Sequence, residues 1–151
     1  MRRFVITLGA IAVLVLLPAQ AAWAGDLFAV GNGTLAGRET NFSFSLHLSP
    51  SGGSGHAVIH DATDGDAQGH VCPGIVVETR GTVQFWIEVE KGSGTLGLFP
   101  FVKITATDSG EQPPNGGVPD SLTVQGASAC TFPGTFGFSA PVDQGNIVVK
   151  P

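Results

Sequence analysis

Histidine and aspartate residues crowd one short stretch of this chain and are of the types that bind metal ions. Three of the four histidines and three aspartates stand within fifteen residues: His56, His60, Asp61, Asp64, Asp66 and His70. His56 and His60 share one face of a predicted strand, so both imidazoles are expected to reach one ion. Carboxylates around a glycine suit Ca²⁺, whereas imidazole with carboxylate suits Zn²⁺ or Cu²⁺. The alternative is a polar hairpin whose aspartates and glycine serve turn geometry.

A second acidic group flanks a long predicted loop, with Asp108 and Glu111 at its start and Asp120 at its end. Because Asp108 ends one predicted strand and Asp120 precedes the next, the two carboxylates are expected to converge at one edge of a sheet. They could hold a cation there, and Ca²⁺ is the ion that such oxygen ligands favour. The alternative is that they accept hydrogen bonds from the loop's own backbone amides.

Trp86 is the candidate for stacking on a ligand. It projects from the face of its predicted strand opposite to the core-like Phe85 and Ile87. An exposed indole can stack on a sugar ring or dock a partner, and Gln84 and Glu88 beside it could bond hydroxyl groups. The alternative is that a loop or a second apolar layer covers the indole, since tryptophan is highly buried on average.

Catalysis has little support in the sequence. Serine, histidine and aspartate all occur, but no Gly-x-Ser-x-Gly elbow stands between a strand and a helix. Acid pairs exist, yet their spacing along the chain does not place any two at the separation that glycosidases need. The sequence therefore predicts a protein that is not an enzyme, with a small secreted hydrolase as one alternative.

The first 24 residues have the pattern of a cleaved signal peptide. Arg2 and Arg3 form a positive start, Phe4 to Leu17 is an apolar run, and Ala22-Trp23-Ala24 is a small-x-small cleavage pattern. The apolar run is too short to cross a bilayer of about 30 Å, and no second apolar segment follows it. We therefore expect no transmembrane segment after processing, and a working chain from Gly25 to Pro151 that is secreted, periplasmic or extracellular.

The charge and the cysteines of residues 25–151 restrict the partners and the compartment. Five basic residues against twelve acidic ones give a formal charge of -7, once Arg2 and Arg3 are left out of the total of seven. Such an acidic surface argues against nucleic acid as a partner and is compatible with cations, neutral sugars or proteins. In an oxidising compartment, the two cysteines, Cys72 and Cys130, are expected to form one disulfide.

The hydrophobic pattern predicts short strands and no amphipathic helix. Apolar residues alternate with polar ones over Asn41 to Ser49 and Gly81 to Lys91, which is typical of strands with one buried face. Less regular strands are expected over 27–30, 56–60, 69–77, 101–108, 121–125, 135–139 and 146–150, with turns at 31–33, 50–53, 64–66, 91–94 and 110–119. About eight or nine short strands with this spacing indicate a single-domain, all-β, antiparallel β-sandwich or barrel.

About half of the chain resembles a known family. The segments concerned are His70-Val71-Cys72, Ile75-Val76-Val77, Gly81 with Val83 to Val89, Val102 to Glu111, and Pro119 to Val124. They are similar to small secreted bacterial β domains of the post-COAP type, although Val-Cys-Pro-Gly stands where that family has Val-Thr-Cys-Leu. The resemblance covers residues 55–124 and implies an extracellular all-β module, often an accessory to larger secreted proteins. It transfers no catalytic residues.

These observations together predict a secreted, non-catalytic structural or binding module of the bacterial envelope or extracellular space. Its partner would be a protein or a glycan. A Ca²⁺- or carbohydrate-binding domain that uses the aspartate-rich turns or Trp86 is the alternative, and a small secreted hydrolase is the second alternative.

Overall fold

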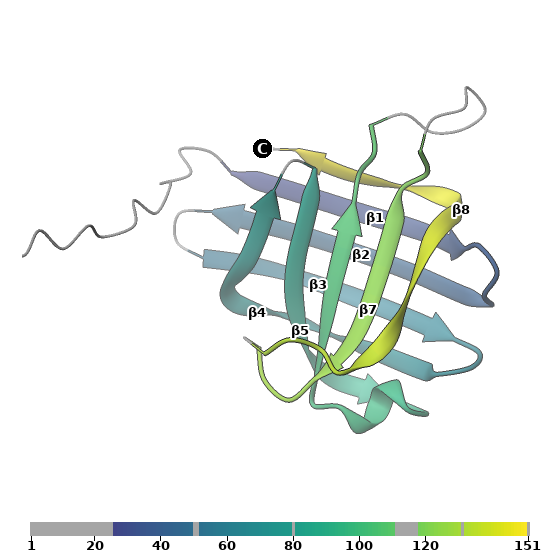
Figure 1. Cartoon of the computed structure of the whole chain (residues 1–151). Coiled ribbons are helices and arrows are strands. Elements are labelled where there is room, and N and C mark those ends of the chain that lie inside the picture. Colours follow the sequence, from purple (N-terminus) through teal and green to yellow (C-terminus); the bar gives the residue numbers. More distant parts are fainter. Residues whose placement is uncertain (1–25, 50–51, 80, 111–117, 131, 151) are drawn as a thin grey trace, which may run out of the picture.

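The chain folds into a closed antiparallel barrel of eight strands, in which each strand pairs with the next and the last pairs with the first (Figure 1). The computed structural model describes residues 26–49, 52–79, 81–110, 118–130 and 132–150, so the predicted signal peptide lies outside the described residues. The strands, with one 3-10 helix η1 (Leu96–Leu98), are β1 (Leu27–Leu35), β2 (Thr40–Ser49), β3 (Gly52–Asp61), β4 (Gly65–Thr79), β5 (Thr82–Gly92), β6 (Phe101–Thr107), β7 (Ser121–Ala127) and β8 (Phe136–Lys150). The predicted all-β antiparallel fold is confirmed, as a barrel. Within the described ranges, no helix has the length and apolar character needed to cross a membrane.

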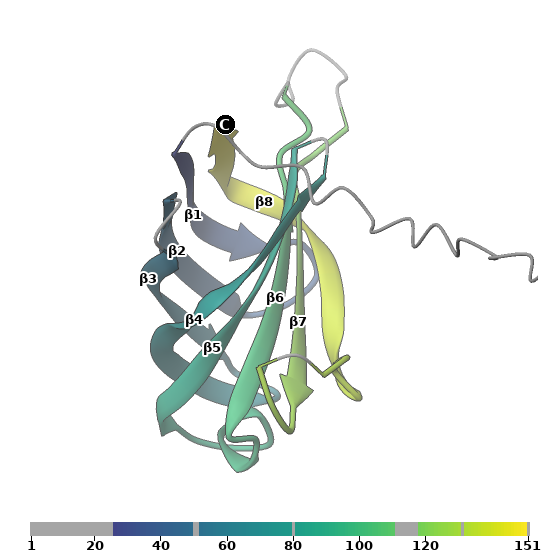
Figure 2. The same cartoon turned by 90° about the vertical axis from the view of Figure 1, so that its left-hand side faces the viewer.

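Two long strands bend and close the barrel. Strands β1 to β3 cross β5 to β7 steeply, and β4 and β8 run along both sides (Figures 1 and 2). In β4 the pairing with β5 shifts register between Val71 and Val76. In β8 the residues up to Pro141 pair with β7, and those from Val142 onward pair with β1. The two strands predicted over 135–139 and 146–150 are therefore one bent strand.

The interior of the barrel is a packed hydrophobic core. The predicted alternation holds in β2 and β5, where Phe42, Phe44, Phe85 and Ile87 point inward. The rings of Phe44 and Phe85 meet across the barrel with centroids 5.4 Å apart, although their strands are not neighbours. Inward side chains of all eight strands form one cluster, as expected for a small barrel that is filled by side chains. The barrel is thus filled by its own side chains.

The turn predicted at Gly31-Asn32-Gly33 is wrong, because β1 runs straight through it. Glycine is needed here for space, since a Cβ atom on Gly31 would overlap the Phe44 ring. A glycine inside a strand often marks such a close approach, and by sequence alone it has the same appearance as a turn glycine. The first hairpin turn comes later, between Leu35 and Thr40.

Candidate binding site on the outer face of the barrel

The predicted disulfide between Cys72 and Cys130 is present, and both cysteines pack with Trp86 in one apolar cluster. Trp86 lies on the outer face of β5 as predicted, but its side chain is only 7% exposed. Its indole N–H donates a hydrogen bond to the carbonyl oxygen of Phe132 at 3.0 Å, and the Lys103 ammonium lies 5.4 Å from its ring centroid. The expectation of an exposed stacking platform is therefore corrected: the loop after β7 folds over the indole.

Asp108 and Asp120 do converge at one edge, and both accept hydrogen bonds from backbone amides. Asp120 is 2% exposed and accepts from the N–H groups of Ile147 at 2.8 Å and Ser109 at 3.0 Å. Asp108 accepts from Val149 at 3.0 Å and from Gly110 at 2.8 Å. Glu111, the third predicted ligand of this group, lies outside the described residues. Bonding to the loop's own amides is thus observed for Ser109 and Gly110, and the amides of Ile147 and Val149 come from β8, which was not expected.

The two carboxylates compensate for the bend of β8. After Pro141 this strand leaves β7 for β1, so amides on its other side need acceptors that no strand supplies. We expect Asp120→Ala to lower the free energy of unfolding by about 2 kcal/mol, because it leaves the buried Ile147 N–H unsatisfied. Urea titration against the exposed Asp143→Ala would measure this. Equal stability of the two variants would contradict the role of Asp120 in bonding the amides of β8.

Asp61 and Asp64 are held by an arginine rather than left open for a cation. The Arg38 guanidinium donates to both oxygens of Asp61, at 2.9 and 3.1 Å, and to Asp64 at 2.6 Å. It also lies 4.0 Å from the centroid of the Phe138 ring. Burial by itself would raise the pKa of Asp61, but hydrogen bonds from Arg38, Thr40 and two backbone amides outweigh it and lower that pKa to about 2. This network joins the turn between β1 and β2 to the turn between β3 and β4.

All four histidines lie on the outer face of β2 to β4, which we call the histidine face. The expectation that His56 and His60 reach one ion is not met, because each faces a different partner across the β3–β4 pair. His56 is opposite His70, and His60 is opposite Asp66 and bonded to its carboxylate. Residues four apart on a strand are separated by about 13 Å, which is too far for one ion.

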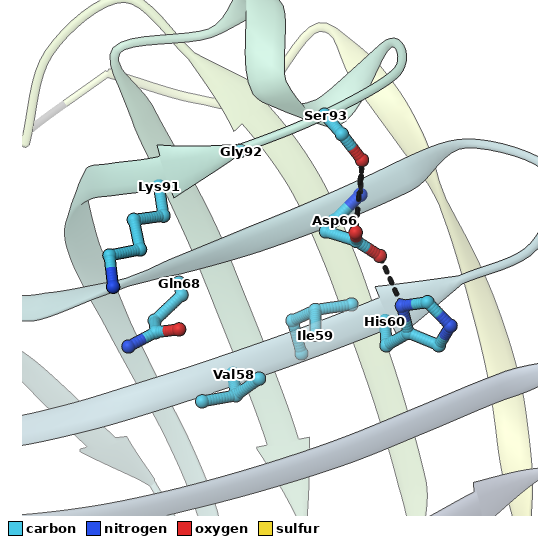
Figure 3. Close-up of a pocket in the computed structure, with 8 residues that line it drawn as sticks. All are labelled: Val58, Ile59, His60, Asp66, Gln68, Lys91, Gly92 and Ser93. Carbon is cyan, nitrogen blue, oxygen red and sulfur yellow. Dashed lines mark hydrogen bonds and ion pairs between the residues drawn. The ribbon is translucent and has the colours of Figure 1, made fainter.

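A shallow hollow of about 290 Å³ lies on the outer face of β3 to β5. Figure 3 shows Lys91 and Gln68 at one side of it and the linked His60, Asp66 and Ser93 at the other. Val58 lies on β3 directly opposite Gln68, at the same side of the hollow. The hollow therefore offers an ammonium, an amide, an imidazole and a carboxylate together with a small apolar side chain, which is the composition of a site for a polar ligand.

Ser93, Asp66 and His60 contain the groups of a catalytic triad, but in a different order. The Ser93 hydroxyl donates to Asp66 at 3.0 Å, and the other oxygen of Asp66 faces His60 Nδ1. In a working triad the imidazole stands between serine and aspartate, so that it takes the serine proton. Here the carboxylate stands between them, and the imidazole lies on its far side. The order of the three groups therefore differs from that of a working triad.

Sequence reasoning missed Gln68, Lys91, Ser93 and Arg38. One signal could have revealed the first of these: β3 and β4 form a hairpin whose pairs are placed evenly about Thr63. Centring the turn there puts His60 opposite Asp66, Val58 opposite Gln68, and His56 opposite His70. Contacts between segments far apart in the chain bring Lys91 and Ser93 to the hollow and Arg38 to Asp61 and Asp64. The local spacing of residues carries no signal for such contacts.

Comparison with known proteins adds no relative on which to rely. No protein-family model, curated protein or solved structure matches this chain. The resemblance to the post-COAP type therefore stays a prediction.

Proposed function

We propose that this protein is a non-catalytic binding module of the bacterial envelope or extracellular space, and that it recognises a glycan with the hollow on β3 to β5. The observation that carries the proposal is the contrast between a filled barrel and a hollow on its outer surface. The Gln68 amide can donate and accept, the Lys91 ammonium donates, and the Asp66 carboxylate accepts. Sugar hydroxyls need this mixture of donors and acceptors.

Two further observations support the proposal. The Cys72–Cys130 disulfide fits an oxidising compartment, in agreement with the leader predicted from the sequence. The order of Ser93, Asp66 and His60 argues against nucleophilic catalysis at this hollow. The alternatives fit less well: Arg38 occupies the carboxylates of Asp61 and Asp64, and Asp108 and Asp120 accept backbone amides, so a Ca²⁺ site would have to displace these partners.

Binding to a panel of extracellular polysaccharides and peptidoglycan fragments tests the proposal. We expect at least one member to bind. Gln68→Ala and Lys91→Ala should each weaken that binding about tenfold, because each removes a hydrogen bond to a sugar hydroxyl, which is about 1.4 kcal/mol of binding free energy. Gln144→Ala and Lys150→Ala, on the exposed part of β8, are the matched controls. Absence of binding across the panel, or binding indifferent to Gln68 and Lys91, would contradict glycan recognition. Hydrolysis of a panel member that Ser93→Ala abolishes would contradict the non-catalytic assignment.

A further inference from the structure

We infer that His56 and His70 form a binding site for a divalent transition-metal ion such as Cu²⁺ or Zn²⁺, next to the hollow but independent of its glycan. The two residues lie directly opposite each other on β3 and β4. Side chains in this relation have Cβ atoms about 5 Å apart and stand on the same face of the sheet. The pair therefore stands on two hydrogen-bonded strands and not on a loop.

The distance between the two rings already suits a shared ion. Their centroids are 5.3 Å apart and their planes are inclined by 71°. An ion that binds two imidazole nitrogens at about 2.1 Å, with a near-tetrahedral angle between them, holds the two ring centroids about 5 Å apart. Both imidazoles can thus reach one ion by rotation of the side chains, without movement of the backbone.

The Glu90 carboxylate fixes the tautomer of His70 that can bind a metal ion. The carboxylate lies 2.8 Å from His70 Nδ1 and, being an acceptor only, places the proton on that nitrogen. The lone pair of Nε2 is then available to a metal ion. A carboxylate behind a ligating imidazole is the usual outer partner of histidine ligands, where it fixes the tautomer and strengthens the ligand. Glu88, which is directly opposite His70 on β5, adds a second negative charge nearby.

The site is accessible and open. The side chains of His70 and Glu90 are 67% and 50% exposed, so a hydrated ion can reach them. Within the part of the chain that the structure describes, no three His, Cys, Asp or Glu side chains are arranged around one ion. Two imidazoles therefore supply the protein ligands, and water or a group from a partner completes the coordination. Imidazole ligands select Cu²⁺, Zn²⁺ or Ni²⁺ over Ca²⁺, and Cu²⁺ binds most tightly in this series.

Separate calorimetric titrations of the protein with Cu²⁺ and with Zn²⁺ test the site. We expect one saturable ion per chain, and at least a tenfold loss of affinity for His56→Ala and for His70→Ala. Glu90→Ala should weaken binding about tenfold, because it removes the outer partner of His70. In the wild type the electron paramagnetic resonance spectrum of bound Cu²⁺ should show coupling to two nitrogens, and in either histidine variant to one.

His47→Ala is the matched control, since His47 is also exposed on the histidine face and has a carboxylate, that of Asp26, at 3.6 Å. Its affinity for both ions should equal that of the wild type. The inference is overturned if neither ion binds saturably. It is also overturned if the His56→Ala, His70→Ala double variant binds like the wild type. Loss of binding in His60→Ala would overturn it too, because the ion would then be bound by His60 and Asp66. A failure to bind glycans would leave these results unchanged, so the two proposals can fail separately.

Discussion

Asp61→Ala is expected to lower the free energy of unfolding by about 3 kcal/mol, because it leaves the partly buried Arg38 guanidinium without its main partner. For a domain of this size that corresponds to a fall in Tm of about 12 °C. The carboxylate also accepts from the backbone amides of Thr63 and Asp64 at 2.9 and 2.6 Å, so the turn between β3 and β4 loses its anchor as well. Thermal and urea unfolding, monitored by circular dichroism, would measure the loss.

The same network predicts a pH dependence whose sign follows from the pKa of Asp61. This pKa is lowered in the folded state from 3.8 to about 2. A carboxyl group with a depressed pKa contributes stability above its unfolded pKa, and this contribution, about 2 kcal/mol, is lost as the pH falls through the folded pKa. Stability should therefore decline between about pH 4 and pH 2 in the wild type, and less steeply in Asp61→Asn.

Glu39→Gln is the control for both experiments, because Glu39 follows Arg38 in the chain but its side chain is exposed. We expect this variant to unfold within about 0.5 kcal/mol of the wild type and to keep its acid profile. Should Asp61→Asn retain the full decline between pH 4 and pH 2, other carboxyl groups would be responsible and the assignment to Asp61 would be wrong.

Removing the disulfide is expected to have the largest effect on stability. Cys72 and Cys130 are 58 residues apart, and closing a loop of that length restricts the unfolded chain by about 4 kcal/mol in the chain-entropy description. The double variant Cys72→Ala, Cys130→Ala should keep the barrel core, since β4 and β7 retain their strand partners. Urea unfolding of this variant and of the oxidised wild type would give the difference directly.

Tryptophan fluorescence gives a second measure of the same change. Trp86 is the only tryptophan of residues 25–151, and it is covered by the loop that Cys130 tethers. Without the disulfide this loop should lift from the barrel, and the native emission maximum should move to longer wavelength. Phe101→Ala would remove an apolar neighbour of this outer cluster while leaving the tether intact, and its emission should shift less. An unfolding free energy within 1 kcal/mol of the wild type, with unchanged emission, would contradict the stapling role.

Several features of the fold and the site could be predicted from residue patterns because they depend on nearest neighbours. The alternation in Asn41 to Ser49 and Gly81 to Lys91 places every second side chain in the core, whatever the other strands do. The same parity placed Trp86 on the outer face. The disulfide could be predicted without the fold, because a chain with only two cysteines allows only one pairing.

Other features depended on which strand lies beside which. Gly31 had the composition of a turn, and only the Phe44 ring from β2 explains its place inside β1. Whether an outward-facing side chain stays exposed depends on what folds over it, and the loop that covers Trp86 comes from a segment more than forty residues later. Asp108 and Asp120 were correctly expected to converge. Besides the loop amides of Ser109 and Gly110, however, they bind two amides of β8, whose bend the sequence does not reveal.

The all-β character, the single disulfide and the cluster of histidines and aspartates could be read from the residues, because composition and two-residue periodicity act locally along the backbone. Which of those polar groups meet depends on the packing of the strands. Strand register placed His56 against His70 rather than His60, and a contact between the β1–β2 turn and the end of β3 paired Asp61 with Arg38. A side chain's partner is set by the lateral packing of strands, and a shift of one residue in pairing exchanges every neighbour while leaving the periodic pattern of the sequence unchanged.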